Sequence, residues 1–211
     1  MFSKGRTTSK AFIDDNYNWL SLSINSSTSA IEKTLSDERQ RIDEESKEIK
    51  DFDERNTYVH QFDNYFNLLD YALSNIRTGI FITIYSYWEK SLAQICDYYN
   101  MNVAKSNKKE DNSPCANDYY RALKELHLDN RPIFKRIKNI YRPIRNAFSH
   151  RGDLKSFEVA TINAANFNGL TICDRFPIIN DNSFLHQALT DINSELKYIE
   201  NQCNINNNKC Q

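Results

Sequence analysis

The stretch FDNYFNLLDYALSNIRTGIFITIYSYWEKSLAQI, residues 62–95, decides the fold of this chain. Its apolar side chains recur every three or four positions, the period of one buried helix face. The spacing predicts one long helix over Tyr58–Tyr99, bent at Gly79. The apolar positions are Phe62, Tyr65, Phe66, Leu69, Leu73, Ile76, Ile80, Ile84, Trp88, Leu92 and Ile95. A helix this long and this apolar needs other helices to cover it.

The composition agrees with a helical fold. The chain has 211 residues, of which 40% are hydrophobic and 26% charged, and it contains only four Gly and four Pro. Few turn-forming residues disfavour a loop-rich β fold. We expect an all-α, up-and-down multi-helix bundle forming one domain over residues 29–200. A partly ordered N-terminal arm, residues 1–28, precedes it, and a polar tail, residues 201–211, follows.

Outside the central helix, three further segments are predicted. Residues Ser29–Arg55 are highly charged, with Leu35, Ile42 and Ile49 spaced by sevens, which predicts a long helix with a narrow contact seam. A solvated bundle edge is the favoured interpretation, and a coiled contact with a second chain is the alternative. A polar loop over residues 100–117 and a shorter helix over Asn117–Leu128 follow.

The C-terminal third combines a small hairpin with a last helix. Phe157–Ile162 and Leu170–Ile179 are rich in β-favouring residues, and Asn163–Gly169 between them has turn composition. The pattern predicts a β-hairpin. Asp181 or Asn182 then starts a final helix with apolar residues at helical spacing.

Asp129, Asn130 and Pro132 signal the start of another helix, because Pro is tolerated in the first helical turn. Two stripes run along it. The apolar stripe contains Ile133, Ile137, Ile140, Ile144 and Phe148, and the basic stripe contains Arg131, Lys135, Lys138, Arg142 and Arg145. Pro143 should kink this helix or mark a restart, and Gly152 is placed to end it.

Charge and cysteine content restrict the functional classes. The net charge of −1 excludes a uniformly basic surface for nucleic acid. However, residues 131–151 hold seven Lys or Arg and no Asp or Glu, so one segment is basic. The five cysteines include no C-x-x-C pair and no zinc-like spacing with His, and we expect reduced thiols, no metal and no cofactor. No apolar run is long enough to span a membrane, which favours a cytoplasmic protein.

Arg145, Asn146 and His150 carry the chemistry of the basic segment. An arginine holds a phosphodiester through two charge-assisted hydrogen bonds. A histidine gives or takes a proton near neutral pH. Arg145 is followed directly by a polar residue, and four residues separate it from His150. This pattern resembles the motif of the HEPN superfamily. Many members of that family are dimeric, helical, metal-independent endoribonucleases that act as toxins or antiviral effectors, and others are non-catalytic.

The resemblance implies that Arg145, Asn146 and His150 are catalytic. His150 would act as general acid or base while the 2'-hydroxyl of RNA attacks the adjacent phosphorus, and Arg145 would neutralise the developing charge. Asn146 would orient His150 or bind the sugar. The residues expected to bind flanking phosphates of the substrate are Arg142, Arg151 and Lys138. Glu89 is the polar residue on an earlier helix that many members place near the motif.

The expected partners are an RNA substrate, a second copy of the chain that completes a composite active site, and an antitoxin or regulatory protein. Gly152 stands where one branch of the family carries a tyrosine that is nucleotidylated, so that mode of control is not expected. The alternative function is a non-catalytic helical module that binds RNA or protein. The purely structural interpretation of Arg145 and His150 is a surface ion pair and a helix cap. For the basic stripe, it is a solvated helix face.

Overall fold

The computed structural model describes residues 9–104, 114, 116–150 and 152–209. The elements are α1 (Ser9–Lys47), α2 (Phe52–His60), α3 (Asp63–Tyr98), α4 (Ala116–Ala122), the 3-10 turns η1 (Lys124–Leu126) and η2 (Leu128–Asn130), α5 (Pro132–Arg136), the π-helical turn η3 (Ile137–Tyr141), α6 (Arg142–His150), α7 (Ser156–Ala165), β1 (Leu170–Cys173), β2 (Phe176–Ile179) and α8 (Asn182–Lys209). The all-α bundle with a small hairpin is therefore confirmed.

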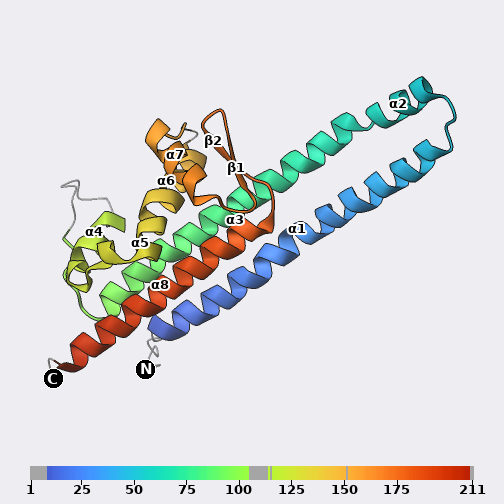
Figure 1. The fold of residues 1–211 in the computed structure, drawn as a ribbon. Helices are drawn as coiled ribbons and strands as arrows, with labels where there is room; N and C mark the ends of the chain where they lie inside the picture. Colours follow the sequence, from blue (N-terminus) through green and yellow to red (C-terminus); the bar gives the residue numbers. More distant parts are fainter. Residues whose placement is uncertain (1–8, 105–113, 115, 151, 210–211) are drawn as a thin grey trace.

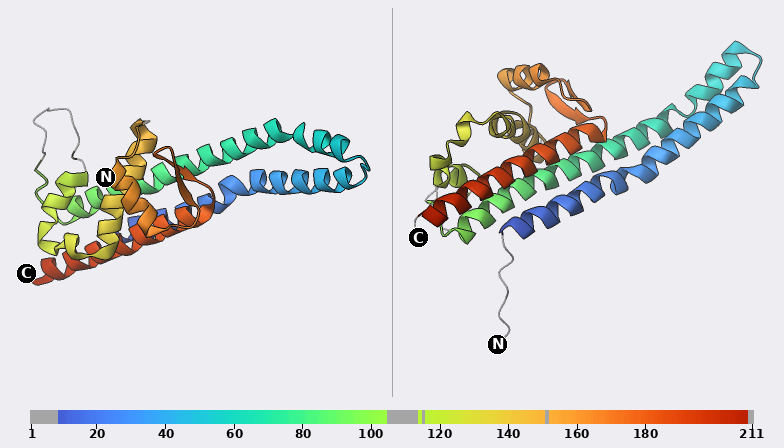
Figure 2. Two further views of the ribbon diagram at one scale, coloured as in Figure 1. Left: turned by 45° about the horizontal axis from the view of Figure 1, so that its top comes forward. Right: turned by 60° about the horizontal axis from the view of Figure 1, so that its bottom comes forward.

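Three long helices form the body of the molecule. Helices α1, α3 and α8 run side by side, and α4 to α7 with the β-hairpin pack together on one side of them (Figures 1 and 2). The core is centred on α3, where Trp88, Phe81 and Ile84 are fully buried. No helix within the described residues is both long and apolar enough to cross a membrane.

Helices α1 and α3 continue beyond the N-terminal end of α8 and, together with α2, form a projecting arm (Figure 1). We call residues 32–70 the distal arm. Leu35 and Ile42 of the seven-residue seam are buried where α1 lies along α3, and Arg39 bridges to Asp70 across the two helices at 3.0 Å. The seam is therefore used within the chain.

The N-terminal segment differs from the expectation of a partly ordered arm. Helix α1 begins at Ser9 and crosses residue 28 without a break, because Ile13, Leu20 and Ile24 are buried in the core. Packing of an apolar face outweighs the weak helix propensity of the surrounding Ser, Thr and Asn. At the other end, α8 continues to Lys209, and buried Cys203 explains why residues 201–209 are helical.

The central helix is interrupted at a different place from the one predicted. The break lies at residues 61–62, between α2 and α3, whereas α3 runs through Gly79. One glycine in a helix costs about 1 kcal/mol relative to alanine, and burial of Phe81 and Ile84 nearby outweighs that cost. The predicted helix over Asn117–Leu128 is also shorter, since α4 ends at Ala122.

The hairpin exists, but its predicted first strand is wrong. Residues 157–162 belong to helix α7, whose start is capped by Glu158 accepting the backbone N–H of Lys155 at 2.7 Å. The two strands lie within residues 170–179, with Leu170 opposite Ile179. Asp174 and Arg175 form the turn with φ of 47° and 67°. Two successive positive φ values are typical of a type I′ hairpin turn, which usually carries Asn-Gly. Asp174-Arg175 is not such a pair, so this turn could not be predicted from its residues.

Candidate functional site

The helix that carries Arg145 and His150 begins as predicted, with Pro132 at its first position. It then widens into the π turn η3 before continuing as α6. In this turn the Arg142 N–H donates to the carbonyl of Ile137. Pro143 has no N–H, and its ring would clash with the carbonyl of Asn139 in a regular α-helix. The irregularity expected at Pro143 therefore takes the form of a π turn, a feature frequent at functional sites.

The apolar stripe of this helix is confirmed. Ile137, Ile140 and Ile144 are buried in the core, and Ile133 and Phe148 pack against it while staying partly exposed. Phe134 and Tyr141 are also fully buried. Only the remaining side of the helix can therefore meet a ligand.

Two buried carboxylates of α8 anchor the same helix. Asp191 accepts hydrogen bonds from Arg136 Nη1 at 2.7 Å and from the Tyr141 hydroxyl at 2.6 Å. Burial raises the pKa of Tyr141, so its hydroxyl stays protonated and donates. The fully buried Glu195 pairs with Arg131 Nε at 2.6 Å. The charge of Arg131, the first residue of the predicted basic stripe, is therefore used within the fold.

Arg145 lies between three neighbours and remains partly accessible. Its Nη2 is 3.5 Å from Glu89 Oε2 on α3, and its Nη1 donates to Asn146 Oδ1 at 3.2 Å. Its guanidinium carbon lies 5.7 Å from the centre of the Tyr85 ring. The side chain is 27% exposed. Arg145 is thus held on one side and open on another, as a phosphate-binding arginine requires.

Asn146 and His150 line a pocket of about 330 Å³ together with Lys155 and Glu158 at the start of α7. His150 is the last residue of α6 and is exposed. The Gly152 N–H donates to the Ala147 carbonyl at 3.3 Å, which closes the helix end as expected. Asn146 therefore connects the two main motif residues, because it contacts Arg145 directly and shares this pocket with His150.

The predicted substrate-binding residues are not all gathered at this pocket. Arg142 Nη1 donates to Asn117 Oδ1 of α4 at 2.9 Å. Lys138 pairs with Asp129 at 2.8 Å. Both side chains thus lie towards α4 and η2 and line no part of the pocket that contains His150. Arg151 lies outside the described residues.

Three side chains near the motif were not singled out from the sequence. Tyr85 and Glu89 are four residues apart on α3, so they share a helix face, and this spacing could have indicated that Tyr85 accompanies Glu89. Burial is the main cause that raises the pKa of Tyr85. Lys155 and Glu158 gave no such signal, because their segment was interpreted as the beginning of a strand.

Comparisons of this chain with protein-family models, with curated proteins and with solved structures returned no match. Among the residues that the structure describes, no three His, Cys, Asp or Glu side chains come together as a metal-binding group.

Proposed function

We propose that this protein is a metal-independent endoribonuclease of the HEPN type. It cleaves RNA by attack of a 2'-hydroxyl on the adjacent phosphorus and leaves a 2',3'-cyclic phosphate and a 5'-hydroxyl. The observation that carries the proposal is the position of Asn146, which accepts a hydrogen bond from Arg145 and lines one pocket with His150. Arg145 also contacts Glu89 and does not itself line that pocket.

Each motif residue has a role in the proposed reaction. Arg145 binds the non-bridging phosphoryl oxygens and stabilises the charge that develops on them. His150 removes the proton from the 2'-oxygen or delivers one to the departing 5'-oxygen. Asn146 orients His150 or binds the sugar. Glu89 does not touch the substrate and acts as a positioning residue for Arg145.

One histidine per motif serves only one of the two proton transfers. A dimer that brings two copies of Arg145 and His150 to one cleft would supply both the base and the acid. The exposure of His150 at the end of α6 leaves it accessible to a second copy. By the same family resemblance, we propose a role as a toxin or antiviral effector in the cytoplasm, restrained by an antitoxin or regulatory protein.

The test is cleavage of total RNA in the presence of EDTA by the wild type, Arg145→Ala and His150→Ala. Loss of a general acid or base lowers the rate by about 10²- to 10⁴-fold. Loss of a charge-stabilising donor lowers it by about 10²- to 10³-fold. Matched controls are Arg39→Ala on the distal arm and His186→Ala on α8, whose side chain contacts Asn25 at 3.0 Å. Equal cleavage by all five proteins would contradict the proposal.

A non-catalytic interaction module is the second candidate. It is favoured by large apolar side chains exposed on or beside the distal arm: Phe52 is 70% exposed, and Leu68 and Tyr71 are each 68% exposed. Phe52 belongs to α2, and Leu68 and Tyr71 belong to α3. Exposed apolar patches are typical of interaction surfaces. A folded wild type that binds RNA or a protein but never cleaves RNA would support this function over the first.

A further inference from the structure

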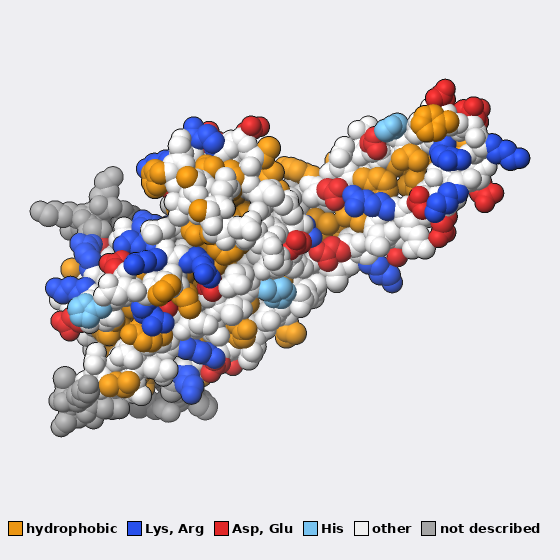
Figure 3. All heavy atoms as spheres, viewed as in Figure 1, with side chains coloured by type: hydrophobic (Ala, Val, Ile, Leu, Met, Phe, Trp, Pro, Cys, Tyr) orange, Lys and Arg blue, Asp and Glu red, His pale blue; other side chains and the backbone are white. Residues whose placement is uncertain are grey.

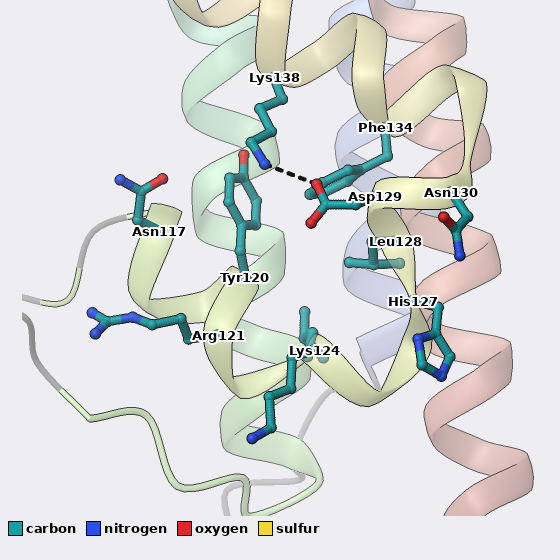
Figure 4. A pocket seen from close by; sticks show the side chains of 11 residues that line it. Asn117, Tyr120, Arg121, Lys124, His127, Leu128, Asp129, Asn130, Phe134 and Lys138 are labelled. Atoms are coloured by element: carbon teal, nitrogen blue, oxygen red, sulfur yellow. Dashed lines mark hydrogen bonds and ion pairs between the residues drawn. The ribbon is translucent and has the colours of Figure 1, made fainter.

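A second pocket lies between α4 and the segment η2–α5, and it contains none of the three motif residues (Figure 4). Its volume is about 640 Å³, in the range of sites that hold small organic ligands. The lining residues are Asn117, Tyr120, Arg121, Leu123, Lys124, His127, Leu128, Asp129, Asn130, Phe134 and Lys138. Most of them are polar or charged.

The floor of this pocket is part of the core and is therefore preformed. The rings of Tyr120 and Phe134 pack edge to face with centroids 4.9 Å apart, and Leu123 and Leu128 are buried beside them. Trp88 Nε1 donates to the Tyr120 hydroxyl at 2.9 Å, which fixes the orientation of that ring. A ligand would therefore contact a floor of side chains that is already ordered.

The rim favours an anion. It carries Arg121, Lys124 and Lys138 against the single carboxylate of Asp129. The Lys138–Asp129 pair, 40% and 75% exposed, contributes little free energy, so a ligand phosphate can replace Asp129. Arg121 pairs with Asp118 but is 57% exposed. Exposed Lys124 forms no ion pair with any described residue. Figure 3 shows Lys and Arg side chains gathered over α4 and α5.

The pocket is connected to the proposed catalytic residues through Arg142. Asn117, on the pocket wall, accepts the hydrogen bond from Arg142, which precedes Arg145 by three residues. Lys138 and His150 are separated by about 18 Å at 1.5 Å of helix rise per residue. An extended polyanion of several units could therefore contact both places at once, whereas a single phosphate could not.

We propose that this pocket binds a flanking nucleotide of the RNA substrate, several positions away from the cleaved bond. Lys124 and Lys138 hold its phosphate, and the amide groups of Asn117 and Asn130 contact its sugar or base. The inference rests on the proposed ribonuclease function for the identity of the polymer. It places Lys138 at this second position, away from His150, and it makes cleavage depend on nucleotides beyond the scissile dinucleotide.

The test measures binding of a 12-nucleotide 2'-O-methyl RNA, which lacks the attacking hydroxyl and cannot be cut, to the wild type, Lys124→Gln and Lys124→Gln/Lys138→Gln. The matched control is Lys33→Gln, an exposed lysine on the distal arm. The pocket variants should bind about five- to tenfold more weakly than the control. The slope of log K against log salt should shrink by about 0.7 for each lysine lost. Both side chains are solvent-accessible, and unchanged thermal melting verifies folding.

Two further results separate this inference from the proposed function. If the wild type does not cleave RNA, the ribonuclease proposal fails, and the binding comparison still decides whether the pocket contacts RNA. If the wild type cleaves but the pocket variants bind the 12-mer as the control does, this inference alone is overturned. AMP serves as the free-nucleotide probe: tight AMP binding that Lys124→Gln abolishes, with RNA binding unaffected, would overturn the flanking-nucleotide assignment.

Discussion

Arg145, which we propose to be catalytic, is held in position by its neighbours in the absence of a substrate. Its guanidinium faces the carboxylate of Glu89 and the amide oxygen of Asn146 and lies beside the Tyr85 ring. The Nε atom of Arg145 is buried and has no hydrogen-bond partner among the described residues. Groups that are oriented in advance stabilise developing charge without reorganising during the reaction. The exposed part of the guanidinium is therefore the part that we assign to the phosphate.

Glu89→Ala should slow cleavage of RNA by about 10- to 100-fold, because a catalytic group displaced by about 1 Å can lose that much rate. The loss should appear in kcat with little change in KM, since Glu89 does not contact the substrate. Glu89→Gln keeps an acceptor oxygen and should retain more activity than Glu89→Ala. Steady-state kinetics on a short RNA give both parameters.

Glu44→Ala, on the distal arm, is the matched control for loss of a carboxylate. Unchanged kcat in Glu89→Ala would show that Arg145 does not depend on this contact.

The spacing of Arg145, Asn146 and His150 could be recognised from the sequence, since all three lie within six residues of one helix. The presence of Lys155 and Glu158 in the pocket with His150 could not be predicted, because it depends on where the chain returns after α6. Arg142 and Arg131 looked equivalent on the basic stripe. Their different partners, Asn117 and the buried Glu195, come from elements distant in the sequence.

At the scale of elements, α8 determines the position of the motif helix, which is the continuous segment α5–η3–α6 that carries Arg145 and His150. Asp191 and Glu195 are four residues apart and form two ion pairs to the helix that leads into the motif. Buried carboxylates that lose their partners, or partners that lose their carboxylate, are strongly destabilising. The motif helix should therefore depend on α8 both for its stability and for its orientation.

Asp191→Ala should lower the free energy of unfolding by about 3 kcal/mol, because it leaves Arg136 and the buried Tyr141 hydroxyl without their acceptor. Urea denaturation followed by circular dichroism measures the change. The control is Asp70→Ala, which breaks an ion pair whose two side chains are 55% and 53% exposed and should cost less than about 1 kcal/mol. Equal losses in both variants would contradict the anchoring role of Asp191.

Element prediction succeeded where the apolar period was strong and failed where packing or turn geometry decided. The buried face of the motif helix and the start of α8, where Asp181 accepts the Ser183 N–H at 2.7 Å, followed from local rules. Helix α7 did not, because its β-branched residues favour a strand. Pro143 predicts an irregularity in this helix, but local rules do not predict that it takes the form of a π turn.

At the scale of the whole molecule, the bundle leaves the motif on its surface. Helices α1, α3 and α8 bury the core, and α4 to α7 form a second layer on one side that carries the motif and both pockets described above (Figure 1). The distal arm projects away from this layer. Under the proposed function, this separation would allow one part of the molecule to act on RNA while the distal arm contacts a partner protein.

The proposed composite active site predicts complementation between two inactive variants. Arg145→Ala and His150→Ala, each nearly inactive alone, should regain measurable cleavage when they are mixed and allowed to exchange subunits. A mixed dimer holds one intact Arg145 and one intact His150 at the shared cleft. Cleavage rates of the mixture and of each separate variant are compared at equal total protein. A mixture no more active than its components would contradict a shared cleft.

The fold class followed from the sequence because a long apolar period and few Gly or Pro leave little besides a helical bundle. Its extent did not. The expected boundary at residue 28 lies inside α1, because burial of Ile13 and Leu20 depends on α3 and α8 being present. Contacts between distant segments, and not local propensity, determine where this domain begins.

The chemistry of the cut tests the central claim most directly. The substrate is a DNA oligonucleotide with a single ribonucleotide, incubated with the wild type in EDTA beside its all-deoxy counterpart, with product masses as the readout. We predict one cut, after the ribonucleotide, leaving a 2',3'-cyclic phosphate and a 5'-hydroxyl, and no cut in the all-deoxy strand. A 5'-phosphate product, or cleavage of the all-deoxy strand, would contradict attack by the 2'-hydroxyl and with it the roles of Arg145 and His150.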